Sequence, residues 1–406
     1  MLTHEPPALS RRSFHAALLS PLAAAVARAQ APALKITEIR LKRLKVVREV
    51  GSMEAAWNPG TTTRVTVGGG SYVEVHTDQG LTGIGPGMSA GVLASARRQL
   101  IGADPTHVEE LWPRLQYYAR GSGYHGSAGL DIALWDLIGK AAGQPLYKLW
   151  GAAKERVAAY ASMVKLSTPE ERAELAVKLA GEGWTAIKLR LHYDTMREDL
   201  RLVEVVKKAA GDRMVILTDA NQAQSAGDWQ PGILWDFRRA LETGRELERM
   251  GVFLLEEPRP RFHFDELAEM NRKLEIPLAG GENNTLMSDF RSMVEQGVFD
   301  ILQPECMVMG GVTPLRKIGA LGQLFHRRVM PHHGGGQLGT VAHLHLIASW
   351  THAPYWELLH DPPHLYDNGF AAFRNPPVVK NGFVEMPQGP GLGIEMNPDM
   401  VEREEG

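Results

Sequence analysis

Short apolar segments of strand length alternate with helix-like segments through the second half of this chain, and this alternation restricts the fold more than any other feature. Thr168, Pro169 and Glu171 form a capping box with proline at the first helical position, which marks the start of one of these helices. Eight strands are predicted at 157–163, 186–191, 214–220, 252–257, 277–281, 300–305, 328–331 and 354–359. Eight such units predict a (β/α)8 barrel of the α/β class.

Three carboxylates stand at the ends of successive predicted strands. Asp219 lies in VILTDAN, Glu256 in FLLEEP and Glu282 in PLAGGEN. The carboxyl ends of parallel barrel strands open on one face, so these acids can converge there. A single acid at a strand end is as often a helix N-cap or a solvated loop residue. Three in register favour a site for one hard cation.

The residues around these acids indicate which cation is expected. Asn221 and Asn283 offer further oxygen donors, and the expected ligands include neither cysteine nor histidine. This donor set suits Mg²⁺, with Mn²⁺ as the alternative, better than Zn²⁺. Alternate residues of a strand face opposite sides, so the strand pattern leaves open whether Glu256 or Glu257 faces the metal.

A different pattern precedes the barrel. Residues 35–48 alternate as a strand, and residues 72–80 predict a strand that runs into a turn. The Gly- and Thr-rich segment 51–70 between them predicts a mobile loop. Helices are expected over about 90–148, with a mainly buried one around Trp135. These elements predict an α+β region in front of the barrel.

The first 29 residues resemble a twin-arginine signal peptide. Arg11 and Arg12 precede an apolar stretch at 16–26, and Ala27-Arg28-Ala29 places small residues at the alternate positions that a signal peptidase recognises. The stretch is about half of the ~20 residues that span a bilayer, so no permanent membrane anchor is expected. We expect export to the periplasm, with the mature chain beginning near Gln30. A disordered, alanine-rich tail is the alternative.

Composition excludes some classes of function. A net charge of -3 argues against a nucleic-acid binder, and 406 residues suffice for about two domains. The one cysteine, Cys306, excludes an internal disulfide framework and is expected to be a small buried strand residue. His343 and His345 are expected to be helix residues without a chemical role.

Several short motifs follow one another in a specific order after residue 30. They are Trp135-Asp136-Leu137, Gly143-Gln144-Pro145-Leu146-Tyr147, Ile187-Lys188-Leu189-Arg190, Asp219-Ala220-Asn221, Glu256-Glu257-Pro258, Gly281-Glu282-Asn283, Gln303-Pro304-Glu305, Gly310-Gly311-Val312-Thr313 and Pro331-His332. Together they resemble the enolase superfamily in its mandelate racemase subgroup. The resemblance implies a modified barrel beneath an N-terminal α+β capping domain that the C-terminal tail completes. We therefore expect a signal at 1–29, the cap at 30–155, the barrel at 156–360 and the returning tail at 361–406.

The resemblance also implies the roles of residues at the barrel mouth. Asp219, Glu256 and Glu282 match the family's metal ligands, which selects Glu256 over Glu257. The common chemistry is removal of a proton α to a carboxylate, and a divalent cation stabilises the enediolate that forms. Lys188 would place positive charge beside the same carboxylate oxygens.

A histidine and a carboxylate are expected to supply the base. His332 matches the family base, and Glu305, one strand earlier, can bind its second ring nitrogen and stabilise the imidazolium. His333 is the competing histidine. The family uses aspartate where this chain has Glu305, which is one methylene longer. Glu357 matches the family's electrophilic acid and would donate a hydrogen bond if protonated, with a barrel-end ion pair as the alternative.

Arg190 distinguishes between the reactions of the family. It stands where racemases have the second lysine of Lys-x-Lys, a base on the face opposite the histidine. Arginine keeps its charge, with a pKa above ~12, and is a poor base. Dehydration, for which His332 can suffice, therefore outranks racemisation, and Lys188 stays open as a second acid or base. Arg190 is expected to hold a substrate oxygen or carboxylate.

The expected enzyme is an Mg²⁺-dependent lyase that removes water from an aldonate or aldarate and forms a 2-keto-3-deoxy acid. Substrate choice should lie in segment 51–70 and in contacts from Tyr124, His125 and Asn221. A small carboxylate is the expected partner, in a homo-oligomer. The alternatives are a racemase, epimerase or lactone cycloisomerase, and a periplasmic solute-binding protein. Against the last stands the presence of acid-base residues that binding alone does not need.

Overall fold

The computed structural model describes residues 33–119, 124–361 and 369–405. The residues from Lys35 onward form one compact unit. The predicted signal segment 1–29 lies outside the described residues, so export stays a prediction. Within the described part of the chain, no helix combines the length and the apolar character that a membrane span requires.

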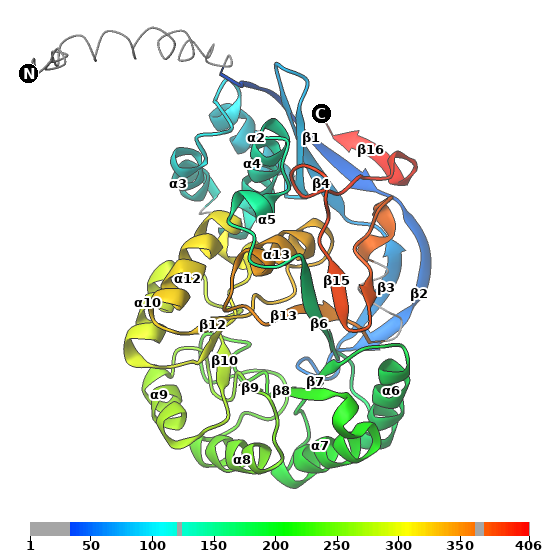
Figure 1. Ribbon diagram of the computed structural model, residues 1–406, viewed down its shortest axis with the longest axis vertical. Helices are drawn as coiled ribbons and strands as arrows, with labels where there is room; N and C mark the ends of the chain where they lie inside the picture. The colour runs from blue at the N-terminus through cyan, green and yellow to red at the C-terminus, as the bar shows by residue number, and fades with distance from the viewer. Residues whose placement is uncertain (1–32, 120–123, 362–368, 406) are drawn as a thin grey trace, which may run out of the picture. The chain divides into compact units, whose positions relative to one another are not determined.

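Eight parallel strands form the predicted barrel (Figure 1). They are β6 (Arg156–Ser162), β7 (Ala186–Arg190), β8 (Val215–Asp219), β9 (Leu255–Glu256), β10 (Leu278–Gly280), β11 (Ile301–Leu302), β12 (Arg328–Val329) and β13 (Tyr355–Leu359). Neighbours pair in chain order from β6 to β12, and β13 pairs with β6. Each strand falls at a predicted position, so the barrel expected from the alternation is confirmed.

Helices surround this barrel on the outside (Figure 1). They are α6 (Pro169–Gly181), α7 (Met196–Ala210), α8 (Phe237–Arg249), α9 (Phe264–Lys273), α10 (Met287–Gln296), α12 (Val312–Leu324) and α13 (Gln337–Ser349). The capping box at Thr168 is present with both of its hydrogen bonds. Cys306 is buried as expected, but it begins the short helix α11 (Cys306–Met309) just beyond a strand, so the strand assignment was wrong.

The barrel interior explains how the sequence positions polar groups at the mouth. An inner layer consists of Tyr160, Ala186, Leu217, Leu254, Ala279, Ile301 and Met330. Side chains two positions apart on a strand face the same side. The residue two positions further along the chain is polar in six of these seven cases: Ser162, Lys188, Asp219, Glu256, Gln303 and His332. The inward-facing side chains thus change from apolar in the barrel interior to polar at the barrel mouth.

The N-terminal cap is an antiparallel sheet packed against helices. Its strands run in the order β16 (Val401–Glu405), β1 (Ile36–Leu44), β4 (Ser71–Thr77) and β5 (Thr82–Pro86), so the C-terminal tail pairs with the first strand. Helices α2 (Ala90–Leu100), α3 (Val108–Ala119), α4 (Ala128–Ala141) and α5 (Leu146–Leu149) follow. Helix α4 is the buried helix expected around Trp135, and it lies so close to β5 that a Cβ at Gly85 would overlap the carbonyl oxygen of Gly129. The strands β14 (Val379–Lys380) and β15 (Phe383–Glu385) extend the barrel sheet at β6.

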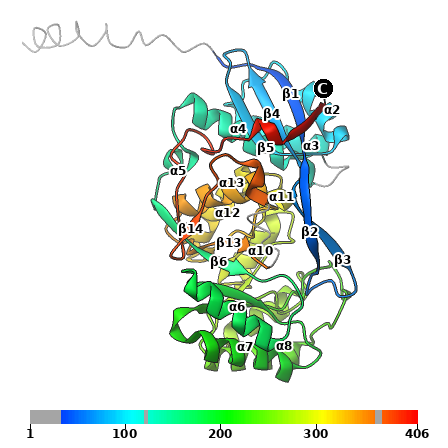
Figure 2. The same ribbon diagram turned by 90° about the vertical axis from the view of Figure 1, so that its right-hand side faces the viewer.

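Segment 51–70 is ordered as part of a hairpin, which corrects the expected mobile loop. Strands β2 (Val46–Glu54) and β3 (Thr62–Gly68) pair antiparallel. The third strand contains the run Thr62-Thr63-Arg64-Val65-Thr66-Val67, which is rich in β-branched residues that favour strands. Three glycines, at 68–70, follow this run rather than interrupt it. Figure 2 shows this hairpin running from the cap alongside the barrel. Its turn is tied to the segment after β6, because Ala56 N donates to Val164 O at 2.8 Å.

A buried contact joins the cap to the barrel near the start of α12. Asp131 of α4 accepts hydrogen bonds from Thr313 N at 2.9 Å and from Thr313 Oγ1 at 2.6 Å. Trp135 Nε1 donates to the same hydroxyl at 2.8 Å. Helix α12 begins at Val312 with Gly311 as its N-cap, so Thr313 lies inside the first turn. The hydroxyl of Thr313 therefore anchors the cap instead of capping the helix.

Candidate metal centre and active site

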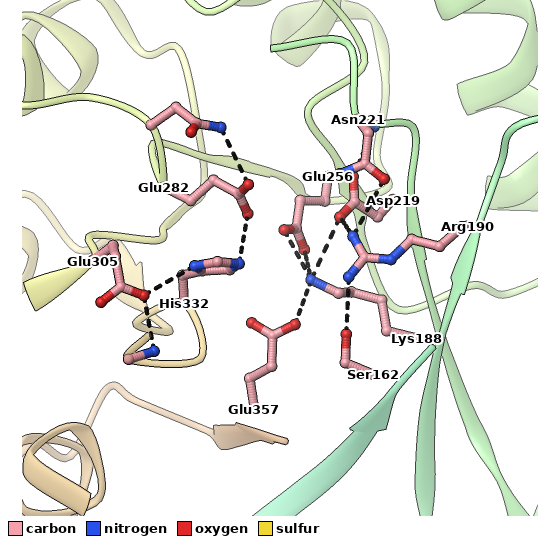
Figure 3. A network of polar contacts seen from close by, with 12 residues as sticks. Ser162, Lys188, Arg190, Asp219, Asn221, Glu256, Glu282, Glu305, His332 and Glu357 are labelled. Atoms are coloured by element: carbon pink, nitrogen blue, oxygen red, sulfur yellow. Dashed lines mark hydrogen bonds and ion pairs between the residues drawn. The ribbon is translucent and has the colours of Figure 1, made fainter. Parts of the chain in front are cut away.

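The three acids that the sequence places at strand ends converge at the barrel mouth (Figure 3). Asp219 ends β8, Glu256 ends β9, and Glu282 follows β10 by two residues. One carboxylate oxygen from each lies within 4.8 Å of the others, and all three side chains are buried. The expected convergence is therefore present in the structure, whereas their role as ligands stays a prediction.

Lys188 lies fully buried among carboxylates (Figure 3). Its Nζ is 2.9 and 2.8 Å from the two oxygens of Glu256, 2.8 Å from Glu357 Oε1 and 3.5 Å from Asp219 Oδ2. Burial alone would lower the pKa of Lys188, but the carboxylates of Glu256 and Glu357 raise it well above its ordinary value. Lys188 is thus held as a cation beside the three acids.

Glu357 forms an ion pair with Lys188. Burial would raise the pKa of Glu357, but the Lys188 ammonium and His332 hold it well below its ordinary value. An ionised carboxylate has no proton to donate, so the structure favours the barrel-end ion pair over the protonated, hydrogen-bond-donating acid.

Arg190 is engaged by protein groups at all three of its nitrogens. Its Nε donates to Met163 O at 2.6 Å, and Nη2 donates to Ser162 Oγ at 3.1 Å. Its Nη1 donates to the Asp219 carboxylate and, at 3.3 Å, to Asn221 Oδ1 (Figure 3). The structure therefore favours Arg190 as a residue that positions Asp219 and Asn221. Contact with a substrate oxygen stays a prediction.

His332 and Glu305 form the expected pair despite the longer glutamate. His332 Nδ1 lies 3.0 Å from Glu305 Oε2, and that carboxylate also accepts from Gly334 N at 2.8 Å and from Met307 N at 3.0 Å. The three donors fix the carboxylate, which in turn orients the ring. His332 Nε2 then faces the metal-site acids, 3.2 Å from Glu282 Oε2. A base on this ring would act directly beside a bound carboxylate.

His332 and Glu305 each stabilise the charged form of the other. Burial alone would raise the pKa of Glu305, but His343 and the hydrogen bond from His332 lower it to about 2. Burial would lower the pKa of His332, but Glu282 and Glu305 raise it to about 10. The competing His333 lies next to His332, and burial together with the His332 charge lowers its pKa to about 3. The paired histidine is therefore His332.

The two histidines lie in helix α13, as expected, and both hydrogen-bond to the backbone. In α13, His343 Nε2 accepts from Cys306 N at 3.0 Å, and its Nδ1 bonds to the carbonyl oxygen of His332. His345 Nδ1 accepts from Tyr147 N at 3.2 Å. His343 consequently supports the backbone that carries the His332–Glu305 pair.

The other predicted contacts lie at the edge of the site or outside the described side chains. Asn221 is bonded to Arg190, and Asn283 Nδ2 donates to Glu282 Oε1 at 3.2 Å, so its amide nitrogen, not its oxygen, faces that acid. Tyr124 and His125 belong to η2 (Tyr124–Ser127), but their side chains are not among those described. Their role as substrate contacts stays a prediction.

Sequence reasoning did not assign several residues that belong to the site. Glu257 is buried with a φ of 45°, and neither carboxylate oxygen has a hydrogen-bond partner among the described residues. Both amide atoms of the buried Gln303 are likewise unpaired. The period-two pattern from Ile301 would have found Gln303. No sequence signal indicates Trp57, whose ring centroid lies 4.8 Å from the Arg190 guanidinium, because it reaches the site from the cap hairpin.

The balance of buried charge fits a divalent cation. Six of the described buried carboxylates gather at the barrel mouth: Asp219, Glu256, Glu257, Glu282, Glu305 and Glu357. Lys188, Arg190 and His332 are the cationic groups that face them. Buried carboxylates in excess of their cationic partners are either protonated or bound to a metal. Burial and the neighbouring carboxylates raise the pKa of Glu256 and Glu257 well above its ordinary value, and a divalent cation would offset that repulsion. The all-oxygen donor set of Asp219, Glu256 and Glu282 matches Mg²⁺ or Mn²⁺.

Comparison with known families agrees with this geometry. The model for the mandelate racemase / muconate lactonizing enzyme N-terminal domain matches residues 47–151. The model described as enolase C-terminal domain-like matches residues 171–400. The two matches cover the cap and the barrel in turn.

The curated relatives of this chain include dehydratases and cycloisomerases. The chain is 28% identical over 347 residues to an arabinonate dehydratase of Saccharolobus solfataricus, covering 81% of this chain and 88% of that protein. It is 32% identical over 349 residues to a D-galactarolactone cycloisomerase of Agrobacterium fabrum, covering 81% of this chain and 89% of that protein.

A solved structure shows the same fold. The L-talarate/galactarate dehydratase of Salmonella typhimurium LT2, liganded with Mg and L-lyxarohydroxamate, superposes with a TM-score of 0.76. The two proteins are 24% identical, and the match covers 93% of this chain and 95% of the other.

Proposed function

From the fact that this chain belongs to the mandelate racemase / muconate lactonizing enzyme family of the enolase superfamily, we propose that it is an Mg²⁺-dependent acid-sugar dehydratase. It would convert an aldonate or aldarate to a 2-keto-3-deoxy acid. The observation that carries the proposal is the position of one histidine–carboxylate pair. His332 and Glu305 lie on one side of the acid cluster, where His332 can act as a base, and Arg190 lies on the other side. The similarity to a dehydratase over most of the chain supports it.

Asp219, Glu256 and Glu282 would hold the cation. Its chemical contribution, as a Lewis acid, would be to stabilise the negative charge that develops on the substrate carboxylate as the α-proton leaves. Lys188, at 2.8 Å from Glu256, places a second positive charge beside these oxygens. The two together make an α-proton acidic enough for a side-chain base.

His332 performs the proton transfers. Its Nε2 faces the acid cluster, where the charge of Glu282 raises the pKa of the ring. A cation held by Glu282 would offset that charge and leave the imidazole neutral, so that Nε2 could take the proton from C2 while Glu305 stabilises the imidazolium that results. The same imidazolium then gives its proton to the hydroxyl leaving C3, so that water departs and an enol remains. The enol becomes the 2-keto acid when C3 gains a proton. Lys188 is occupied by Glu256 and Glu357, which leaves His332 as the base.

The direct test is a product screen. Purified protein with Mg²⁺ is incubated with a panel of aldonic and aldaric acids, and 2-keto acid is measured by semicarbazide absorbance. We expect at least one acid to yield a 2-keto-3-deoxy product. Formation of both C2 epimers without loss of water would show that a second base operates and that the dehydratase assignment is wrong.

Cycloisomerisation is the second candidate, because the cycloisomerase relative is 32% identical over most of the chain. It would use the same acids and the same base on a sugar lactone. Incubation with sugar lactones in D₂O separates the two reactions. Deuterium at C2 with no 2-keto product would favour the isomerase.

Replacing Arg190 by lysine tests the role of the residue opposite the base. Lysine can still pair with Asp219, but it cannot also reach Met163 O and Ser162 Oγ with a planar fork. We expect weaker metal and substrate binding with the product still a 2-keto-3-deoxy acid, measured by calorimetry and NMR. Arg201→Lys, in an exposed ion pair on α7, is the matched control. Appearance of C2 epimerisation in the unmodified protein would contradict the assignment.

We also propose that the protein is exported to the periplasm through its twin-arginine segment. The supporting feature is the order of Arg11-Arg12, the apolar stretch and Ala27-Arg28-Ala29. Arg11→Lys with Arg12→Lys should leave the protein in the cytoplasm with an uncut N-terminus, as fractionation and mass spectrometry would show. A processed periplasmic double variant would mean that another route operates.

A further inference from the structure

A cavity of about 560 Å³ lies beside the barrel mouth. Three parts of the fold enclose it: the turn of the β2–β3 hairpin, the segments that follow β6 and β7, and the long segment between β8 and α8. The metal-site acids, Lys188 and His332 are not among its lining residues, so it is not the catalytic space itself. Its size is within the ~300–1,000 Å³ typical of small-molecule sites.

The walls of the cavity are held by contacts within the protein. On one side, Ala56 N in the hairpin turn donates to Val164 O at 2.8 Å. On the other, Trp235 N donates to Gln222 Oε1 at 2.6 Å. The two sides approach each other at the rim, where Gly232, with a φ of 81°, faces Pro59 so closely that a Cβ would lie 3.4 Å from its Cγ. A preformed cavity binds a ligand without first ordering its walls.

The lining combines aromatic rings with amide groups. The rings are Trp57, Tyr193 and Trp235, and the amides are Asn221, Gln222 and Gln230. Both amide atoms of Gln222 are already bonded within the protein, to Trp235 N and to Ala220 O. The Oε1 of Gln230 is buried and has no hydrogen-bond partner among the described residues. A sugar ring has apolar C–H faces that pack on aromatic rings and hydroxyls that pair with amides. The combination fits a saccharide better than a purely apolar ligand.

The charge of the lining excludes a second carboxylate as the occupant. Glu171 and Asp194 are its acidic members, and the described lining contains neither lysine nor arginine. His192 is neutral, because burial lowers its pKa to about 4. An anion would meet only acids and neutral groups here, at a cost in free energy. The occupant is therefore not an anion.

The cavity adjoins the catalytic site through two of its lining residues. Asn221 is two residues from Asp219 and accepts from Arg190 Nη1 at 3.3 Å. Trp57 stacks on the Arg190 guanidinium. Arg190 and Trp57 therefore stand between the acid cluster and the cavity, and the distal end of a substrate bound at the acids would have to pass beside these two side chains to reach it.

We propose that the cavity is a subsite for a neutral sugar ring joined to the acid sugar, so that the substrate class is the aldobionic acids. This inference rests on the proposed function. The C2 proton and the C3 hydroxyl of the acid unit leave as water, as in the proposed reaction. The glycosidic bond at O4 stays intact, and the product is the glycosylated 2-keto-3-deoxy acid.

Paired substrates test the subsite. Lactobionate, cellobionate and maltobionate each carry a neutral hexose on O4 of gluconate, so gluconate is their common reference. We expect kcat/KM for the best of them to exceed that for gluconate by about tenfold, an ordinary gain for one pocket contact. Saturation-transfer NMR on the Mg²⁺-loaded protein should show the protons of the neutral ring in contact with it. This second measurement does not depend on turnover.

Filling the cavity should remove the advantage of the longer substrate. Ile233 lines it and is 41% exposed, so Ile233→Trp can fold while its indole occupies the space. The aldobionic acids should lose their advantage and gluconate should be unaffected. Leu324→Trp is the matched control, since Leu324 is 74% exposed on α12 and does not line the cavity.

The outcomes separate the subsite from the reaction. If no acid is dehydrated, the proposed function fails, and contact of the neutral ring in the NMR measurement still supports the subsite. If gluconate is dehydrated as fast as the aldobionic acids, or no neutral ring is contacted, the subsite is overturned while the dehydratase stands.

Discussion

Glu282→Gln should abolish turnover while the chain stays folded. The side chain is the third member of the acid cluster, and its oxygens face Asn283 and His332. An amide of the same size keeps the packing but removes one negative ligand from the proposed Mg²⁺ site. The affinity for Mg²⁺, measured by calorimetry, should fall by more than the ~10–100-fold that loss of an outer-shell partner costs. Activity should disappear with it.

The folded state is the control for this prediction. Glu282→Gln relieves repulsion among the buried carboxylates and also removes the charge that faces His332 Nε2. These two effects on the free energy of unfolding oppose each other, so the melting temperature without metal should change little. Glu269→Gln, in an exposed pair with Lys273 on α9, is the matched substitution and should change neither property. Exhaustive chelation of the unmodified protein should have the same effect as Glu282→Gln. Full turnover after chelation would contradict the metal site.

His332→Asn should lower kcat by at least ~100-fold, the lower end of what general acid-base catalysis contributes. Among the histidines whose side chains the structure describes, His332 is the one with Glu305 on Nδ1 and the acid cluster on Nε2. Asparagine can keep a hydrogen bond to Glu305 but cannot take a proton. Mg²⁺ and substrate should still bind, so KM should change less than kcat. The loss of C2 proton exchange in D₂O would report the same step separately.

Two further variants separate the base from its partner. Glu305→Gln should reduce kcat less than His332→Asn, because the amide holds the ring but does not stabilise its charged form. His107→Asn, at an exposed position before α3, is the matched control and should behave as the unmodified protein. Turnover by His332→Asn close to that of the unmodified protein would assign the proton transfer to another group.

Local rules made much of the fold and the acid cluster predictable. Asp219 and Glu256 follow the inward-facing Leu217 and Leu254 by two positions, so their direction follows from strand geometry. Eight strand-length runs predict a closed barrel, and closure brings all carboxyl ends to one mouth. The same rule would have identified Gln303. These features depend on the spacing of residues along the chain and need no knowledge of distant contacts.

The capping hairpin shows where local rules fail. The glycines and threonines of segment 51–70 favour a loop by composition, yet β2 and β3 pair over most of their length. The pairing is completed by contacts with the barrel, including Ala56 N to Val164 O, which the local sequence does not encode. The placement of Trp57 on Arg190, and with it the cavity, follows from that contact.

The sequence by itself determined which side chains face the barrel mouth, because alternation along a strand and the common direction of parallel strands are regular. Only the tertiary structure decided their partners and charges. Glu357 pairs with Lys188, and Arg190 is engaged by Asp219 and the backbone of the preceding strand end. Charge states in a buried site depend on distances between atoms from segments far apart in the chain, and those distances exist only after the strands close into a barrel and the cap covers its mouth.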